Sequence, residues 1–304
     1  MPLFMATSLV RRLAQRPWLT VFDPLLREAA LTLAAARKAN NARPSRAAID
    51  ALYRRGHHVR PLLLGHRGAM ARAPENTLAA FQAALSDGGD GVELDVQLTA
   101  DAVPIVLHDD TLDRTTTLRG QPIRFEASEL DACDAGAWFP GWTAREKVPR
   151  LSEVFAALPA GSVVNVELKG PTPLTLGLER RVLEVIRAHP SIHVVVSSFH
   201  PAQLLAVRVL APDVPIGLLF AGDNLWPLRT AWAAPVLMPD ALHPHAALVD
   251  AALVARAHRA GMRVHVWGVA SSDDADRLLA LGVDALIVND VKAIAAVFAA
   301  HGHR

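Results

Sequence analysis

Leu62-Leu63-Leu64-Gly65-His66-Arg67-Gly68 has the pattern that indicates the fold of this chain. A short apolar run, typical of a buried strand, leads directly into titratable side chains. Two later stretches repeat the pattern: Gly91-Val92-Glu93-Leu94-Asp95-Val96 and Pro104-Ile105-Val106-Leu107-His108-Asp109. A helical run, Thr77–Leu85, separates the first stretch from the second. Titratable groups that gather at strand ends usually mark a site of chemistry. The three stretches therefore predict strands that contribute to one functional site.

Strand-like and helical runs continue to alternate after these stretches. The strand-like runs are Leu62–Gly65, Gly91–Val96, Val103–Leu107, Ser162–Leu168, His193–Ser197, Pro215–Phe220, Met238–His243, Met262–Val269 and Ala285–Val288. The helical runs include Thr77–Leu85, Leu151–Leu158, Leu176–His189, Pro201–Leu210, Leu248–Ala260 and Ser272–Leu281. Such alternation indicates an α/β fold with a parallel sheet covered by helices. We expect a closed (β/α)8 barrel of the TIM type, with a doubly wound open sheet as the alternative.

The barrel is expected to be somewhat distorted. Nine strand-like runs compete for the eight places of such a barrel, and the sequence does not say which one lies outside. The link from Val96 to Val103 is too short for a crossover helix, so the distortion should lie there. The longest irregular region, Thr116–Arg150, contains Trp138-Phe139-Pro140-Gly141-Trp142 and is predicted to form a loop at the barrel rim.

The first 60 residues differ from the rest because they are rich in Ala and Arg. Helical periodicity in Leu25–Ala36 and Arg46–Tyr53, with Ser45 as a possible cap, predicts an N-terminal helical extension over residues 1–60 and a barrel domain over 61–304. The extension either packs on the barrel or in an oligomer, or presents a basic amphipathic surface to anionic lipid. Packing is favoured because acidic residues dilute the positive charge: Asp23, Glu28 and Asp50.

Composition excludes several classes of protein. The 304 residues carry a formal net charge of +1, which gives no support to nucleic-acid binding. A hydrophobic content of 51% is ample for a core. The single Cys133 suits a reducing compartment. No run has the length of a membrane-spanning helix and no convincing signal peptide is present, so we predict a cytoplasmic protein without stable membrane insertion.

The second stretch indicates a metal site. Glu93 and Asp95 alternate with apolar residues and must point to the same face of a strand. Two adjacent carboxylates repel each other unless a cation lies between them, and a hard divalent cation takes oxygen ligands. A solvated edge strand is the alternative, but the opposite face is entirely apolar: Val92, Leu94 and Val96.

The later run Asn165-Val166-Glu167-Leu168-Lys169 repeats this logic. Glu167 and Lys169 share a face, and the flanking apolar residues favour an interior location over a surface ion pair. Glu167 would complete a cage of three carboxylates with Glu93 and Asp95. The cation would then keep its remaining positions for water and substrate oxygens.

Three residues beside this cage suggest chemistry on a phosphate ester. The guanidinium of Arg67 matches the geometry of phosphate oxygens. His66 and His108 are imidazoles whose ordinary pKa lies near neutrality, so one can accept a proton while the other donates one. The sequence does not decide which histidine plays which part.

Taken together, these residues and their order resemble the glycerophosphodiester phosphodiesterase family, and the resemblance covers about Leu62 to Val297. The resemblance rests on an ordered set of motifs: His66-Arg67-Gly68, Pro74-Glu75-Asn76-Thr77, Glu93-Leu94-Asp95, His108-Asp109, Leu112-Asp113-Arg114-Thr115 and Glu167-x-Lys169. Later segments also look like that family: Asp134–Phe139, Ser198-Phe199 and Val264–Trp267. No single motif is decisive, but the ordered set is highly specific.

The resemblance implies a TIM-type barrel that hydrolyses glycerophosphodiesters to glycerol 3-phosphate and an alcohol. The roles that it implies are acid–base catalysis by His66 and His108, Ca²⁺ or Mg²⁺ binding by Glu93, Asp95 and Glu167, phosphate binding by Arg67 and Lys169, and a substrate pocket lined by Phe199 and Trp267. Glu75 would support the first loop rather than contact the metal.

Two reaction routes are consistent with these roles. In the first, one histidine deprotonates the glycerol 2-hydroxyl, which attacks phosphorus, while the other protonates the departing alkoxide. Water then opens the cyclic phosphate. The rival route is direct attack on phosphorus by a metal-bound water molecule. A transient cyclic glycerol phosphate would distinguish the two.

The C-terminal part departs from the family pattern at Gly268-Val269-Ala270 and at Val288-Asn289-Asp290-Val291-Lys292. Neither departure removes a proposed catalytic group, but both leave pocket shape and alcohol preference open. A related barrel phospholipase, acting on lysophospholipid or sphingolipid, is an alternative enzyme. A non-catalytic phosphoester-binding protein is a third, less favoured hypothesis, because every expected site residue is present. The oligomeric state is not specified.

Overall fold

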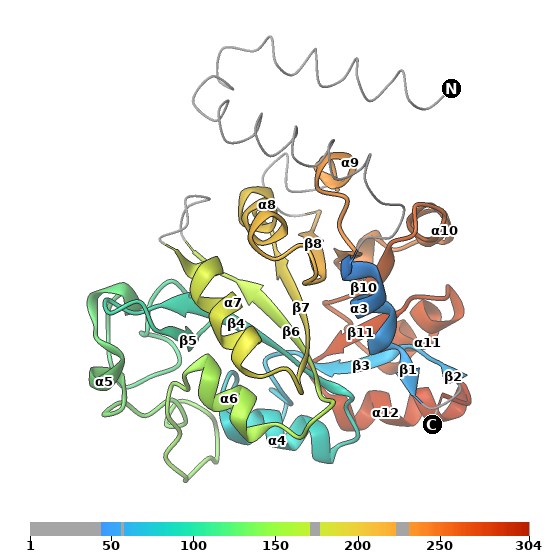
Figure 1. Cartoon of the computed structure of the whole chain (residues 1–304). Helices are drawn as coiled ribbons and strands as arrows, with labels where there is room; N and C mark the ends of the chain where they lie inside the picture. The colour runs from blue at the N-terminus through green and yellow to red at the C-terminus, as the bar shows by residue number, and fades with distance from the viewer. Residues whose placement is uncertain (1–43, 56–57, 171–176, 223–230, 304) are drawn as a thin grey trace.

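The computed structural model describes residues 44–55, 58–170, 177–222 and 231–303. Its centre is a closed barrel of eight parallel strands, with helices around it (Figure 1). The strands are β3 Leu62–Gly65, β4 Gly91–Leu98, β6 Val163–Leu168, β7 His193–Ser198, β8 Ile216–Phe220, β9 Ala241–Pro244, β10 Arg263–Val266 and β11 Ala285–Val288. The barrel closes because β3 pairs with β11 on one side and with β4 on the other. The predicted TIM-type barrel is confirmed, and the open sheet is excluded.

The ninth strand-like run lies outside the barrel. It forms β5, Pro104–Val106, which pairs antiparallel with the far end of β4. The first residues of β4 pair with β3, and its last three pair with β5. Both β3 and β5 are therefore hydrogen-bonded to the same edge of β4. This is the irregularity that the short link after Val96 predicts.

Close approach of β4 to β6 requires glycine at the start of β4. A Cβ atom at Gly91 would lie 1.7 Å from the carbonyl oxygen of Val163, a distance that no side chain can occupy. The register of this pair then places Asp95 beside Glu167. A substitution at Gly91 would therefore shift the two strands that carry the acidic residues.

The outer layer consists of the connecting helices. The longer ones are α4 Leu78–Ser86, α6 Leu151–Ala157, α7 Leu178–Ala188, α8 Pro201–Leu210, α10 Ala251–Arg259, α11 Ser272–Ala280 and α12 Val291–Ala300, and the shorter ones are α5 Ala127–Leu130, α9 Ala234–Leu237, η2 Pro122–Arg124 and η3 Ala246–Leu248. Outward-facing strand residues such as Val92 and Leu94 pack against helical residues such as Phe81 and Phe155. Burial of this apolar surface drives assembly of the two layers. In the described ranges no helix is long and apolar enough to cross a bilayer.

Part of the N-terminal extension closes the bottom of the barrel. Helix α3, Pro44–Leu52, packs against the first residues of several strands, with Ile49, Leu52 and Tyr53 buried beside Leu62. Ser45 lies inside this helix rather than capping it, and its hydroxyl donates a hydrogen bond of 2.8 Å to the Oδ1 atom of Asp240. The predicted helix over residues 25–36 lies outside the described residues. A short hairpin, β1 Arg54–Arg55 and β2 His58–Val59, follows α3.

A group of polar side chains occupies the barrel interior above α3. Tyr53 shares a hydrogen bond with the Nε2 atom of His265, and the ring centroids of His243 and His265 are 4.5 Å apart. Both histidines are fully buried. Burial lowers the pKa of His243 and lowers that of His265 to about 4, so both rings are neutral at physiological pH.

We expect these histidines to make the fold sensitive to acid. Between pH 6.5 and about 4, the unfolded chain takes up a proton at His265 that the folded chain does not, so stability falls as the pH is lowered. When the pH reaches the pKa of His265 in the folded chain, the free energy of unfolding is lower by about 3 kcal/mol because of this residue, since each pKa unit corresponds to about 1.4 kcal/mol. Urea unfolding of the chain and of the His265→Gln variant, each at pH 7.5 and at pH 4.5, measures this loss of unfolding free energy. An equal acid-induced loss in the variant would contradict the assignment.

Candidate active site

The site residues expected from the sequence all lie at the C-terminal end of the barrel. His66 and Arg67 follow β3, Glu93 and Asp95 lie in β4, His108 follows β5, Glu167 lies in β6, Lys169 follows β6, Phe199 follows β7 and Trp267 follows β10. All of them except Asp95 line one cavity of about 120 Å³, and Asp95 contacts Lys169 from behind it. The fold thus gathers the nine residues, and their individual roles remain predictions.

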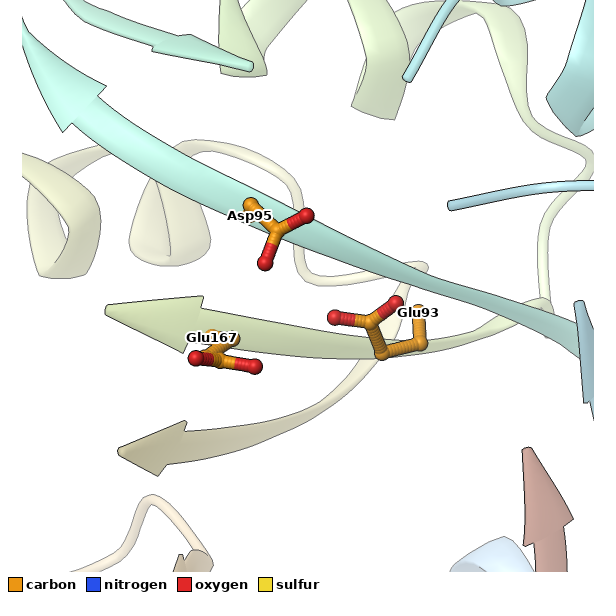
Figure 2. Close-up of side chains that lie close together, drawn as sticks. All are labelled: Glu93, Asp95 and Glu167. Carbon is orange, nitrogen blue, oxygen red and sulfur yellow. The ribbon is translucent and has the colours of Figure 1, made fainter. Parts of the chain in front are cut away.

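Three carboxylates form the acidic centre of the site. Glu93 and Asp95 project from β4 toward Glu167 on the neighbouring strand β6 (Figure 2). One oxygen from each residue lies within 4.8 Å of the others, and all three side chains are buried. Among the described residues this is the one cluster of three or more potential metal ligands. The alternation that aligned Glu93 with Asp95 in the sequence therefore produces a compact oxygen cage.

The chemistry of this cage fits a divalent cation. The Oε1 atom of Glu93 is buried without a hydrogen-bond partner in the described structure. Burial raises the pKa of Glu93 well above its ordinary value, and the negative charges of Asp95 and Glu167 raise it further. A buried, unpaired carboxylate oxygen is costly, and a hard cation with oxygen ligands removes that cost.

Two basic residues flank the cage. The Nζ atom of Lys169 lies 3.2 Å from Asp95 Oδ1 and 2.5 Å from Glu167 Oε1. Burial alone would lower the pKa of Lys169, but the neighbouring acids outweigh burial and raise it, so the ammonium stays charged. The Nε atom of Arg67 lies 3.4 Å from Asp95 Oδ2. Burial likewise opposes ionisation of Asp95, yet Lys169 and Arg67 hold its pKa below the ordinary value.

The first loop is held by Glu75. This buried carboxylate accepts hydrogen bonds from Arg67 at 2.8 Å and from two nitrogens of Arg114 at 2.7 and 2.8 Å. It therefore fixes the direction of the Arg67 guanidinium and lies outside the carboxylate cage. The backbone of Arg67 adopts a left-handed conformation with φ of 52°, and its N–H donates to Glu93 Oε2 at 3.0 Å. Left-handed backbone conformations of residues other than glycine are uncommon and are found often at functional sites.

The two histidines have different partners. His66 Nδ1 donates to Asn289 Oδ1 at 2.7 Å, and its Nε2 atom lies 3.9 Å from Glu93. Burial lowers the pKa of His66 to about 4, and Arg67 contributes in the same direction, so the ring is neutral. His108 Nδ1 instead lies 2.7 Å from the carboxylate of Asp109. The ring of His66 is thus neutral and bound to an amide oxygen, whereas the ring of His108 lies beside a carboxylate.

The structure adds supporting residues to which the sequence analysis gave no role. Asn76 donates to Asp95 Oδ2 at 2.9 Å from a left-handed backbone position, and Arg114 binds both Asp109 and Glu75. Asn289, at the end of the last strand, orients His66. Asn76 and Arg114 fall within the motifs that carry the family resemblance, whereas Asn289 lies in the segment Val288–Lys292, which departs from the family pattern.

The aromatic residues Phe199 and Trp267 line the same cavity as Glu93 and Glu167. The rings of Phe199 and Trp267 meet edge to face with centroids 5.8 Å apart, and Trp267 Nε1 donates to the His243 carbonyl at 3.1 Å. The rim segment Trp138–Trp142 folds on itself, since Phe139 contacts both tryptophans. These ring contacts place the aromatic side chains of the segment against one another.

Comparisons with known proteins agree with this geometry. The profile of the Glycerophosphoryl diester phosphodiesterase family matches residues 66–293. A glycerophosphodiester phosphodiesterase of Caldanaerobacter subterraneus is 35% identical over 234 residues, which cover 76% of this chain and 95% of the relative. A Silicibacter pomeroyi crystal structure superposes with a TM-score of 0.73 and 26% identity, covering 86% of this chain and 99% of its own. An Oleispira antarctica phosphodiesterase, solved with its product sn-glycerol-3-phosphate, superposes with a TM-score of 0.69 and 29% identity, covering 79% and 97%.

Proposed function

The chain belongs to the glycerophosphoryl diester phosphodiesterase family, and on that premise we propose that it hydrolyses glycerophosphodiesters to sn-glycerol 3-phosphate and an alcohol with a divalent cation in its carboxylate cage. The observation that carries the proposal is the convergence of Glu93, Asp95 and Glu167 beside two basic residues and two histidines. The product bound to the Oleispira relative supports the same chemistry.

Each group of the site has a distinct task in this reaction. Glu93, Asp95 and Glu167 would hold Ca²⁺ or Mg²⁺, since both take carboxylate oxygens. When bound, the cation supplies positive charge that polarises a phosphoryl oxygen. Arg67 and Lys169 are positioned to bind the non-bridging phosphate oxygens, where their charge stabilises the transition state.

The histidine partners favour one assignment of base and acid. Because Nδ1 of His66 donates to Asn289, its Nε2 is the nitrogen free to accept the proton of the glycerol 2-hydroxyl. The hydroxyl oxygen then bonds to phosphorus, and the bond from phosphorus to the alcohol oxygen breaks. His108 donates a proton to that departing oxygen, with Asp109 beside its Nδ1 to balance the charge of the protonated ring. Water opens the resulting cyclic phosphate by the reverse proton transfers.

Direct attack of water on phosphorus is the competing route. A glycerophosphodiester that carries hydrogen in place of the 2-hydroxyl separates the two routes. The cyclic route predicts no turnover of this analogue and a transient cyclic glycerol phosphate with the ordinary substrate. Turnover of the analogue would favour direct attack.

We expect removal of divalent metal to abolish activity. Without the cation the three carboxylates lose the charge that balances them, and the phosphate loses its strongest electrostatic partner. A panel of glycerophosphodiesters should be assayed after EDTA treatment and again after addition of Ca²⁺ or Mg²⁺, with circular dichroism as a control for folding. Full activity in protein shown to be free of metal would overturn the metal proposal.

The same panel tests the phospholipase alternative. Vesicles of lysophospholipid or sphingolipid replace the soluble diesters in a parallel assay. The self-packed aromatic rim offers no observation in favour of a lipid substrate. Turnover of vesicles without turnover of glycerophosphocholine would nevertheless reassign the substrate.

A further inference from the structure

A second cavity adjoins the first at the mouth of the barrel. It has a volume of about 410 Å³ and shares His108, Glu167, Lys169 and Phe199 with the smaller cavity. Its other lining residues are Asp109, Asp110, Leu168, Gly170 and His200. We call this space the outer cavity. The smaller cavity, which contains Trp267, Leu219 and Ile287, is the inner cavity.

The two cavities differ in the part of a diester that they suit. The inner cavity, at about 120 Å³, has room for a three-carbon glycerol and combines the charged site residues with four apolar or aromatic side chains: Phe199, Leu219, Trp267 and Ile287. The outer cavity is several times larger, and His108 lies in the wall of both cavities, whereas His66, the proposed base for the glycerol hydroxyl, lines only the inner one. In the proposed reaction His108 protonates the departing alcohol. The alcohol should therefore occupy the outer cavity while the phosphate lies between the two.

The charges around the outer cavity are mostly neutralised within the protein. Lys169 pairs with Asp95 and Glu167. Asp109 pairs with Arg114 at 2.6 Å, and the hydrogen bonds from Arg114 and His108 outweigh burial and hold its pKa at about 2. Burial lowers the pKa of His200, and Lys169 lowers it further, so this ring is neutral.

Asp110 is the exception in this lining. It is exposed, and its carboxylate has no hydrogen bond or ion pair among the described residues, although it lines the cavity. The outer cavity thus carries one negative charge without a counter-charge. The aromatic ring of Phe199 lines the same space. A carboxylate together with an aromatic face is the combination that binds organic ammonium groups.

We propose that the outer cavity selects a cationic alcohol, an aminoalcohol of the ethanolamine or choline type, through Asp110. The inference rests on the proposed function and deepens it by naming the class of head group. Asp110 attracts the ammonium charge, and Phe199 packs against the carbon groups around it. A neutral alcohol of similar size lacks the charge attraction to Asp110 and the cation–π contact with Phe199.

The test is a comparison of selectivity between the chain and its Asp110→Asn variant. The substrates are glycerophosphocholine and glycerophosphoethanolamine, with glycerophosphoglycerol as the neutral reference, at low ionic strength. For each cationic substrate we expect kcat/KM, divided by kcat/KM for the reference, to fall about threefold in the variant. An effect of this size corresponds to the interaction energy of an exposed ion pair. Salt should diminish the difference by screening the charge.

Two further variants sharpen the result. Asp110→Glu keeps the charge and should retain most of the selectivity. Asp213→Asn removes an exposed carboxylate between α8 and β8 that lines neither cavity, and it should leave the ratio unchanged. Equal ratios in the chain and in Asp110→Asn at low salt would overturn the inference. If the chain hydrolyses none of the three substrates, the proposed function itself fails, which is a different outcome.

Discussion

Replacing Glu93 with glutamine will lower kcat/KM for glycerophosphodiesters about a thousandfold or more. The amide keeps the shape of the side chain but removes one of three charges that hold the cation, and losses of this size accompany removal of a preorganised electrostatic contact. The pKa of Glu93 is already raised by burial and by its acidic neighbours, so the metal-free fold should gain from losing that charge. We therefore expect activity to fall while the melting temperature in EDTA is unchanged or higher.

Metal binding provides the readout that does not depend on turnover. Titration calorimetry with Ca²⁺ or Mg²⁺ should show weaker binding to Glu93→Gln, and the rise in melting temperature on adding metal should shrink. Glu184→Gln is the matched control, because Glu184 is exposed on α7 and pairs only with Arg181 in the described structure. Undiminished metal binding by Glu93→Gln would remove Glu93 from the cage.

The second large effect concerns the histidines. His66→Gln and His108→Gln should each lower kcat on glycerophosphocholine by about 10²- to 10⁴-fold, the usual contribution of a positioned acid or base. The rates of the two variants should differ when the substrate carries 4-nitrophenol as its leaving group in place of choline. Because 4-nitrophenolate departs without a proton, His108→Gln should recover most of its rate, whereas His66→Gln should remain slow.

Two comparisons guard this interpretation. His193→Gln, at the exposed start of β7, should behave as the unmodified chain with both substrates. Recovery of His66→Gln in place of His108→Gln would exchange the two roles. Equal recovery of both would mean that neither residue acts as the specific acid, and the hydrogen bonds from Asn289 and Asp109 would need another explanation.

Much of the fold follows from local patterns. Alternating strands and helices predicted a barrel, and the observed β3 and β11 have the bounds that the apolar runs indicated. Helix α12 was not predicted, although its buried residues Val291, Ile294 and Phe298 recur at helical spacing, and the short helices have too few residues to show a period. The segment Pro104–Val106 was read as a strand, but its place outside the barrel depends on which edge of β4 is already taken by β3.

The sequence by itself determined which side chains lie on one face of a strand. That relation has a period of two residues and depends only on neighbours, so Glu93 and Asp95 could be paired without coordinates. Tertiary structure decided which distant groups meet. Asn289 reaches His66 across 223 positions because β11 closes the barrel against β3, and Arg114 reaches Glu75 across 39 positions. Such contacts depend on long-range strand pairing, which leaves no periodic trace in the sequence.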